Sequence, residues 1–175
     1  DRPSPPILVK PGRAPLPPKM TEWRHELQQT VWQGAGICRD AATLAHAIAK
    51  VKALREQLHH GPLSQWLIHT VIPNSTTSAI AIPPKMADPI REWGELRNLI
   101  DVASLILQSA AFRTESRGGH YRRDHPTTHK NWQVHTLIEG DRLLTSAPIP
   151  SSDGWEVSAP MTVLTDIVLS PLVPV

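Results

Sequence analysis

The sequence contains little cysteine, few aromatic residues and no long apolar run. Cys38 is the only cysteine in 175 residues, so no disulfide can form within the chain. This composition fits a reducing compartment such as the cytosol, and we expect Cys38 to behave as a small buried hydrophobic residue. No apolar stretch approaches the roughly 20 residues that a membrane-spanning helix requires.

Charge is also sparse. Charged residues make up 19% of the chain and the formal net charge is +2, which gives no electrostatic reason to expect nucleic-acid binding. The signatures GxGxxG, GxxxxGK[ST], HExxH, CxxC and GxSxG are all absent. Taken alone, the sequence therefore contains no cofactor-binding fold and no complete catalytic set.

Proline, by contrast, is concentrated at the start of the chain. Residues 1–18 include seven prolines, and proline fixes φ and removes a backbone donor. We predict an extended linker over 1–18. The chain opens at Asp1 with no signal-peptide pattern, so we interpret the linker as a strap that joins this domain to a larger upstream one.

Three amphipathic helices are predicted. The first runs over 21–33 with Thr21 as its N-cap, and the second follows Asp40 as N-cap and stops at Gly61. The third begins with Asp88 as N-cap and ends near 113–116. Their apolar faces are predicted to comprise Trp23, Leu27, Val31 and Trp32; then Leu44, Ile48, Val51, Leu54 and Leu58; then Leu96, Leu99, Ile100, Ala103, Ile106, Leu107 and Ala110.

These helices predict a mainly α fold, a three-helix bundle of the spectrin-repeat kind. The linker 1–18 precedes a helical domain at 19–150. Within it, 62–86 is predicted to be an inserted loop, with a short helix or turn at 66–68 and a polar stretch at 74–78. An irregular tail follows at 151–175. Short strands are predicted near 143–149 and 161–169, which are rich in Thr, Val, Ile and Leu.

The segment 113–126, RTESRGGHYRRDHP, carries the densest group of charges. A carboxylate such as Glu115 can neutralise and orient an arginine, and an arginine beside glycine can approach a planar acidic partner closely. The alternative is a solvated charged loop that caps the third helix. The histidines nearby are spaced as in no standard metal site, and they are His120, His125, His129 and His135.

This segment, with WQVHTLI at 132–138, resembles the C-terminal region of the succinate dehydrogenase and fumarate reductase flavoprotein family. That family shows an ESRG-x-H-x-R-x-D-x-P block followed by W-x-x-H-T. The matching residues are Glu115, Ser116, Arg117, Gly118, His120, Arg122, Asp124, Pro126, Trp132, His135 and Thr136. Upstream, Gly36, Ile37, Arg39 and Asp40 resemble the family's G-(I/V)-x-R-D turn.

Within the family the chain looks most like the helical C-terminal domain of the L-aspartate oxidases, of the cyanobacterial or plastid kind. The resemblance implies an FAD-dependent parent that oxidises L-aspartate to iminoaspartate for NAD biosynthesis, in the cytoplasm or, in a plant, the plastid. Quinolinate synthase would use the product. The FAD-binding and capping domains would lie upstream, so the fragment alone would be neither FAD-binding nor catalytic.

What the resemblance leaves for this domain is packing against the flavin domain. By position, we expect a flavin-domain interface made of Arg39, Glu115, Arg117, His120 and Arg122. Arg39 is expected to brace the loop from the neighbouring helix turn, and Trp132 to anchor the return of the loop.

Three alternatives stay open. The parent could be a succinate dehydrogenase or fumarate reductase subunit with an iron–sulfur partner. The chain could be a stand-alone helical module that binds a protein through its Pro-rich strap and its tryptophans. The weakest alternative is a His-rich metal carrier.

Overall fold

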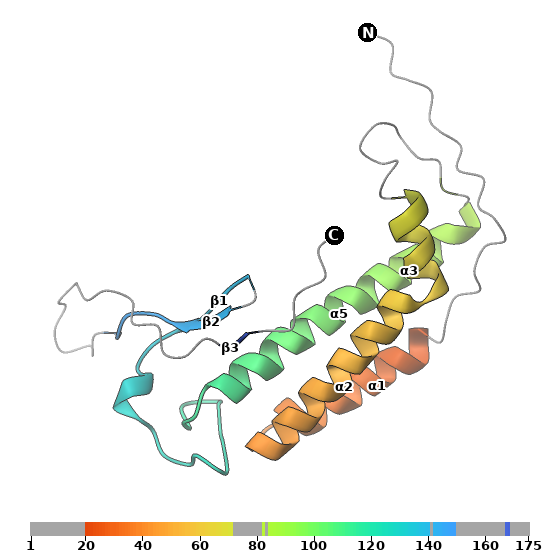
Figure 1. Ribbon diagram of the computed structural model, residues 1–175. Helices are drawn as coiled ribbons and strands as arrows, with labels where there is room; N and C mark the ends of the chain where they lie inside the picture. The colour runs from red at the N-terminus through yellow and green to blue at the C-terminus, as the bar shows by residue number, and fades with distance from the viewer. Residues whose placement is uncertain (1–19, 72–81, 83, 141, 150–166, 169–175) are drawn as a thin grey trace, which may run out of the picture. The chain divides into compact units, whose positions relative to one another are not determined.

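The computed structural model describes residues 20–71, 82, 84–140, 142–149 and 167–168 (Figure 1). Within these residues the protein is mainly helical and has one small antiparallel sheet. The predicted linker 1–18, the polar stretch 74–78 and the predicted tail 151–175, apart from 167–168, lie outside the described residues.

Three long helices occur where the sequence predicts them. They are α1 (Met20–Ala35), α2 (Ala41–His60) and α5 (Ala87–Phe112). The predicted caps at Thr21 and Asp88 are wrong, because both residues lie inside the first turn of a helix that begins one residue earlier.

The predicted cap of α2 is confirmed. Asp40 Oδ1 accepts a hydrogen bond from the backbone amide of Thr43 at 2.8 Å, and Thr43 Oγ1 accepts one from the backbone amide of Asp40 at 3.3 Å. This reciprocal pair satisfies two donors at the start of the helix.

The segment predicted as an inserted loop begins with helical structure. α3 (Pro62–Trp66) follows α2 directly and continues into a π-helical turn, η1 (Leu67–Val71); a 3-10 turn, η2 (Pro84–Met86), precedes α5. Pro62 therefore starts a new helix in addition to ending α2, because its missing N–H is harmless in a first helical turn.

The chain divides into two compact units, and each is described on its own. The first comprises Asp1–Gln29 and Val51–Ile100. In it, Arg24 forms an ion pair with Glu95 at 2.9 Å, which links α1 to α5. The indole N–H of Trp93 donates to Ser64 Oγ at 2.6 Å and links α5 to α3.

The second unit comprises Thr30–Lys50 and Asp101–Val175. Here the helices approach closely at Gly34. A Cβ added there would lie 2.4 Å from Cβ of Ala47 on α2 and 3.3 Å from Cδ2 of Leu107 on α5. Segments of α1, α2 and α5 thus meet, while a continuous spectrin-like bundle stays a prediction.

The predicted apolar faces are partly wrong. On α5, Leu99 is 39% exposed and Ile106 is 48% exposed, whereas the other five predicted positions are buried. At about 100° per residue, Leu99 and Ile106 lie roughly 60–80° to one side of the buried stripe. Trp32 is 73% exposed near the end of α1, and Cys38, predicted to be buried, is exposed in the connection to α2.

The sheet follows the charged segment. β1 (Thr136–Glu139), β2 (Arg142–Thr145) and β3 (Ile167–Val168) pair in the order β1-β2-β3, antiparallel throughout. β2 and β3 fall in the predicted strand regions, but β1 was not predicted. In Figure 1, β1 and β2 form a hairpin, and Gly140 in its turn has a φ of +61°.

Side chains fix this hairpin to the end of α5. Leu143 of β2 and Phe112 of α5 share a buried cluster against which Trp132 packs. The rings of Phe112 and Trp132 meet edge to face, with centroids 5.4 Å apart. Trp132 therefore anchors the return of the loop, as predicted.

Candidate functional site

The segment 113–129 leaves the end of α5 and turns back on itself. Arg117 and His120 exchange backbone hydrogen bonds of 2.8 and 3.0 Å across a two-residue turn. Gly118 occupies the first central position with a φ of +55°, the backbone sign of a type II′ turn. A glycine is favoured there because residues with a Cβ rarely adopt a positive φ.

Glu115 lies two residues before this turn and is fully buried. Its carboxylate accepts hydrogen bonds from Arg113 at 2.9 and 2.5 Å, from Arg117 at 2.9 and 3.1 Å, and from the backbone amide of His129 at 2.9 Å. Burial alone would raise the pKa of Glu115, but these donors outweigh it and lower the pKa to about 2. Glu115 is therefore a charged structural hub.

Arg122 is a second buried charge, with 2% of its surface exposed. Its Nε and Nη2 donate to the two carboxylate oxygens of Asp124 at 2.8 and 2.6 Å. Its Nη1 donates to the carbonyl oxygens of Ala110 and Ala111 at 3.1 Å each. Arg122 thereby caps the C-terminal end of α5, where a cation is favoured.

Asp124 performs the complementary task at α2. Its Oδ2 accepts a hydrogen bond from the backbone amide of Ala41, the first residue of α2, at 2.9 Å. The hydrogen bonds from Arg122 hold the pKa of Asp124 well below its usual range. The charged loop thus links the C-terminal end of α5 to the N-terminal end of α2.

A backbone bridge and an ion pair extend this link. The amide of Arg39 donates to the carbonyl of Tyr121 at 3.2 Å, and the amide of Arg123 donates to the carbonyl of Arg39 at 2.8 Å. Arg123 also pairs with Asp40 at 2.5 Å. The connection before α2 and the charged loop therefore form one hydrogen-bonded structure.

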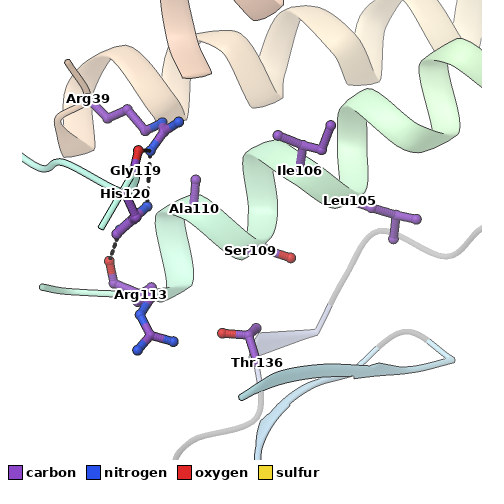
Figure 2. A pocket seen from close by; sticks show the side chains of 9 residues that line it. All are labelled: Arg39, Leu105, Ile106, Ser109, Ala110, Arg113, Gly119, His120 and Thr136. Atoms are coloured by element: carbon purple, nitrogen blue, oxygen red, sulfur yellow. Dashed lines mark hydrogen bonds between the residues drawn. The ribbon is translucent and has the colours of Figure 1, made fainter. Parts of the chain in front are cut away.

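The side chain of Arg39 braces the loop, as predicted. Its Nη1 donates to the carbonyl of Gly119 at 3.3 Å and to Nδ1 of His120 at 3.2 Å (Figure 2). His120 Nε2 lies 3.2 Å from the carbonyl oxygen of Arg113. Because Arg39 can only donate, Nδ1 must accept, and this arrangement assigns the proton of a neutral imidazole to Nε2.

Burial lowers the pKa of His120. The hydrogen bond to the carbonyl of Arg113 opposes this shift, and the positive charges of Arg39, Arg113 and Arg122 add to it. These surroundings favour the neutral imidazole. It acts as a bridge between a guanidinium and a carbonyl oxygen.

An open cavity of about 500 Å³ lies beside this bridge. α5 provides one wall, and Figure 2 shows Arg39 and His120 together at one end, with Thr136 of β1 across from the helix. The lining residues are Arg39, Leu105, Ile106, Ser109, Ala110, Arg113, Gly119, His120 and Thr136. The cavity is apolar along the helix and cationic at the loop.

The five residues predicted as a flavin-domain interface do come together, but they differ in exposure. Glu115 and Arg122 are buried within this chain, whereas Arg39 and His120 are partly exposed and the side chain of Arg117 is 39% exposed. Glu115 and Arg122 can therefore contribute to an interface only by holding the other three in place.

Two residues of the network were left out of the predicted interface. Arg113 joins Glu115 to the carbonyl oxygens of Trp132 and Val134, and Asp124 holds Arg122. The alternation of charge at 113, 115 and 117 and at 122 and 124 was the available signal. It does not reveal which charges face inward, because that depends on packing.

Metal and cofactor ligands were sought within the described ranges. No three His, Cys, Asp or Glu side chains gather there in a way that could hold a metal ion. Gly118 and Gly119 form a tight turn and not the strand-to-helix loop that cradles a dinucleotide. Nor does any described helix combine the length and apolar character needed to cross a bilayer.

Known proteins resemble this chain over most of its length. The L-aspartate oxidase of Synechocystis sp. is 46% identical over 124 residues, covering 71% of this chain and 22% of the relative. The L-aspartate oxidase of Nostoc sp. is 44% identical over 129 residues, covering 68% and 22%. The chain thus spans about a fifth of the length of these relatives.

The fold has a counterpart among solved structures. Sdh1 of Mycobacterium smegmatis in complex with UQ1 aligns with a TM-score of 0.51 and 22% identity, over 93% of this chain and 21% of that one. The family model described as fumarate reductase flavoprotein C-term matches residues 24–65 and 83–152. The chain belongs to this family, as the C-terminal helical domain of a fumarate reductase and succinate dehydrogenase type flavoprotein.

Proposed function

We propose that this chain is the C-terminal domain of an FAD-dependent L-aspartate oxidase, which converts L-aspartate to iminoaspartate for NAD biosynthesis. The observation that carries the proposal is the 46% identity to the Synechocystis L-aspartate oxidase over 71% of the chain. The FAD-binding and capping domains, and with them the catalytic residues, belong to the remaining four-fifths of such a protein. The enzyme would act in the cytoplasm or a plastid and supply quinolinate synthase.

In this proposal the domain packs against the flavin domain through the partly exposed members of the charged loop, Arg39, Arg117 and His120. Glu115 and Arg122 hold that face rigid from inside. A rigid, preorganised surface lowers the entropic cost of docking. Support comes from Arg117. Its Nε and Nη2 donate hydrogen bonds to Glu115 and to the carbonyl of His129, and its side chain is still 39% exposed.

The enzymatic proposal is tested on the full-length protein. L-aspartate is expected to reduce the bound flavin in the absence of oxygen, and to produce hydrogen peroxide in its presence. Succinate at the same concentration is the control substrate. Flavin reduction by succinate with none by L-aspartate would overturn the proposal.

The packing proposal is tested by Arg117→Ala in the same protein. We expect faster loss of flavin on dilution and a lower unfolding temperature, because the contact with the flavin domain is weakened. Arg91→Ala is the matched control, since Arg91 also pairs with carboxylates but is 64% exposed on the other unit. Unchanged flavin retention, stability and activity in Arg117→Ala would refute the packing role.

A second member of the family has some support. The fumarate reductase flavoprotein subunit of Mycobacterium tuberculosis is 29% identical over 135 residues. A parent of that type would reduce fumarate and exchange electrons through an iron–sulfur partner, and the succinate control above separates it from the oxidase.

A further inference from the structure

Arg39 differs from the arginines of the charged loop. Each loop arginine pairs with a carboxylate of this chain at 2.5–2.9 Å, and the pairs are Arg113–Glu115, Arg117–Glu115, Arg122–Asp124 and Arg123–Asp40. In the part of the chain that the structure describes, Arg39 has no ion-pair partner. Its acceptors are neutral, namely the carbonyl oxygens of Ala35 and Gly119 and the ring of His120.

The guanidinium of Arg39 is nevertheless held in place. Its Nε and Nη2 donate to the carbonyl of Ala35 at 3.1 and 3.0 Å, and Nη1 serves Gly119 and His120. A guanidinium has five N–H donors, so one donor on Nη2 is left for a further acceptor. The group is therefore oriented and partly shielded from water, and no carboxylate among the described residues pairs with it.

The cavity beside Arg39 defines what would complement it. Leu105, Ile106 and Ala110 make the helix wall apolar, and no carboxylate lines the cavity. Val102, one helical turn from Ile106, is 53% exposed, so the apolar surface extends along α5. A matching surface would present one carboxylate flanked by apolar side chains.

We infer that Arg39 anchors an Asp or Glu side chain of the polypeptide that packs against this domain in the full-length flavoprotein, with apolar neighbours of that carboxylate covering Ile106 and Val102. The inference rests on the proposed function, because the occupant lies in the part of the flavoprotein outside this chain, which spans 22% of its relatives' length. The remaining N–H on Nη2 can donate one charge-assisted hydrogen bond to that carboxylate, and such a bond is stronger than a neutral one.

The test converts contact into a covalent bond. Arg39→Lys in the full-length flavoprotein is treated with a carbodiimide, which joins an amine to a carboxylate in direct contact as an amide, with loss of one water. Peptide mapping by mass spectrometry is expected to find a cross-link between position 39 and an Asp or Glu outside residues 1–175. The wild-type protein lacks an amine at this position and provides the baseline.

Arg123→Lys is the matched control, because Arg123 pairs with Asp40 at 2.5 Å within this chain. A cross-link from position 123 to position 40, with none from position 39 to the outside, overturns the inference. Bound flavin and the unfolding temperature verify that each variant is folded. If Arg39→Lys does not fold, Ile106→Lys places an amine on the 48% exposed helix wall of the same cavity, and the same criterion applies.

One further variant separates the anchor from the proposed function. Arg117→Lys is treated in the same way, because the side chain of Arg117 is a 39% exposed member of the proposed flavin-domain interface. A cross-link from position 117 to a residue outside 1–175, without one from position 39, would support packing against the flavin domain and would refute the proposed role of Arg39. Cross-links from position 39 to the outside support both.

Discussion

Arg122 and Asp124 form a two-pronged ion pair, with Nε and Nη2 of the arginine 2.8 and 2.6 Å from the two carboxylate oxygens. The pair connects the C-terminal end of α5 to the N-terminal end of α2, and these two helix ends carry partial charges of opposite sign. Arg122 faces the carbonyl oxygens that end α5, and Asp124 accepts from the amide of Ala41 that begins α2. Each charge thus meets the helix end that favours it.

Replacing one member of this pair should be costly. Arg122→Leu leaves the carbonyls of Ala110 and Ala111 without this donor and leaves Asp124 with the amide of Ala41 but without its guanidinium donors. Breaking a buried pair typically costs about 3–5 kcal/mol, and this is an upper bound here because the side chain of Asp124 is 30% exposed. We expect a clear fall in the urea midpoint of the full-length protein. Arg122→Lys should lower the urea midpoint less, because the positive charge remains and only the paired hydrogen bonds of the guanidinium are lost.

Arg123→Gln is the control for this comparison, since the side chain of Arg123 is 58% exposed. Exposed ion pairs contribute little, and its midpoint should stay close to that of the wild type. An equal fall in the urea midpoint for Arg122→Leu and Arg123→Gln would contradict the capping role assigned to Arg122.

Glu115 should govern stability at acid pH. Its pKa is lowered from 4.5 to about 2 in the folded protein, so its ionised form is favoured by folding. The contribution is complete above the unfolded value and is lost as pH falls through 4.5 towards 2. The free energy of unfolding of Glu115→Gln should therefore differ most from wild type near neutral pH, and the difference should shrink below pH 4.5.

His120 should produce a separate dependence at milder pH. Its pKa is lowered from 6.5 by burial and by the neighbouring arginines, so protonation opposes folding. The stabilisation is fully present above pH 6.5 and is lost as pH falls below it. His120→Gln retains one donor and one acceptor without titrating, and it should flatten the pH dependence of the unfolding midpoint below pH 6.5. An unchanged slope would show that another group titrates there.

Two glycines should respond in opposite ways to the same substitution. In Gly34→Ala the new Cβ would lie 2.4 Å from Cβ of Ala47, and forced overpacking costs about 1–3 kcal/mol. In Gly94→Ala nothing lies within 4 Å of the new Cβ, and the better helix propensity should stabilise α5 by roughly 0.5–1 kcal/mol. Thermal unfolding of both variants checks this, and Ala47→Gly should partly rescue Gly34→Ala.

The residues that make up the site could be predicted from the sequence, but which of their side chains are buried could not. Local charge alternation and the G-G turn indicated that Glu115, Arg117, His120 and Arg122 act together. Which of them are buried depends on where α5 ends and how the loop folds back over its carbonyls. This folding back brings together residues far apart in the sequence, such as Arg39 and Gly119, which lie 80 positions apart.

The three long helices, the Asp40 cap and the family could be predicted from the sequence, because helical periodicity, capping and a contiguous motif are local properties. The exposure of Leu99, Ile106 and Trp32 could be read only from the folded chain. The same is true of Arg39, which has no carboxylate partner among the described residues, unlike the four arginines of the charged loop. Both outcomes depend on which surfaces meet in three dimensions, and the free energy of burying a side chain or pairing a charge is set by those contacts.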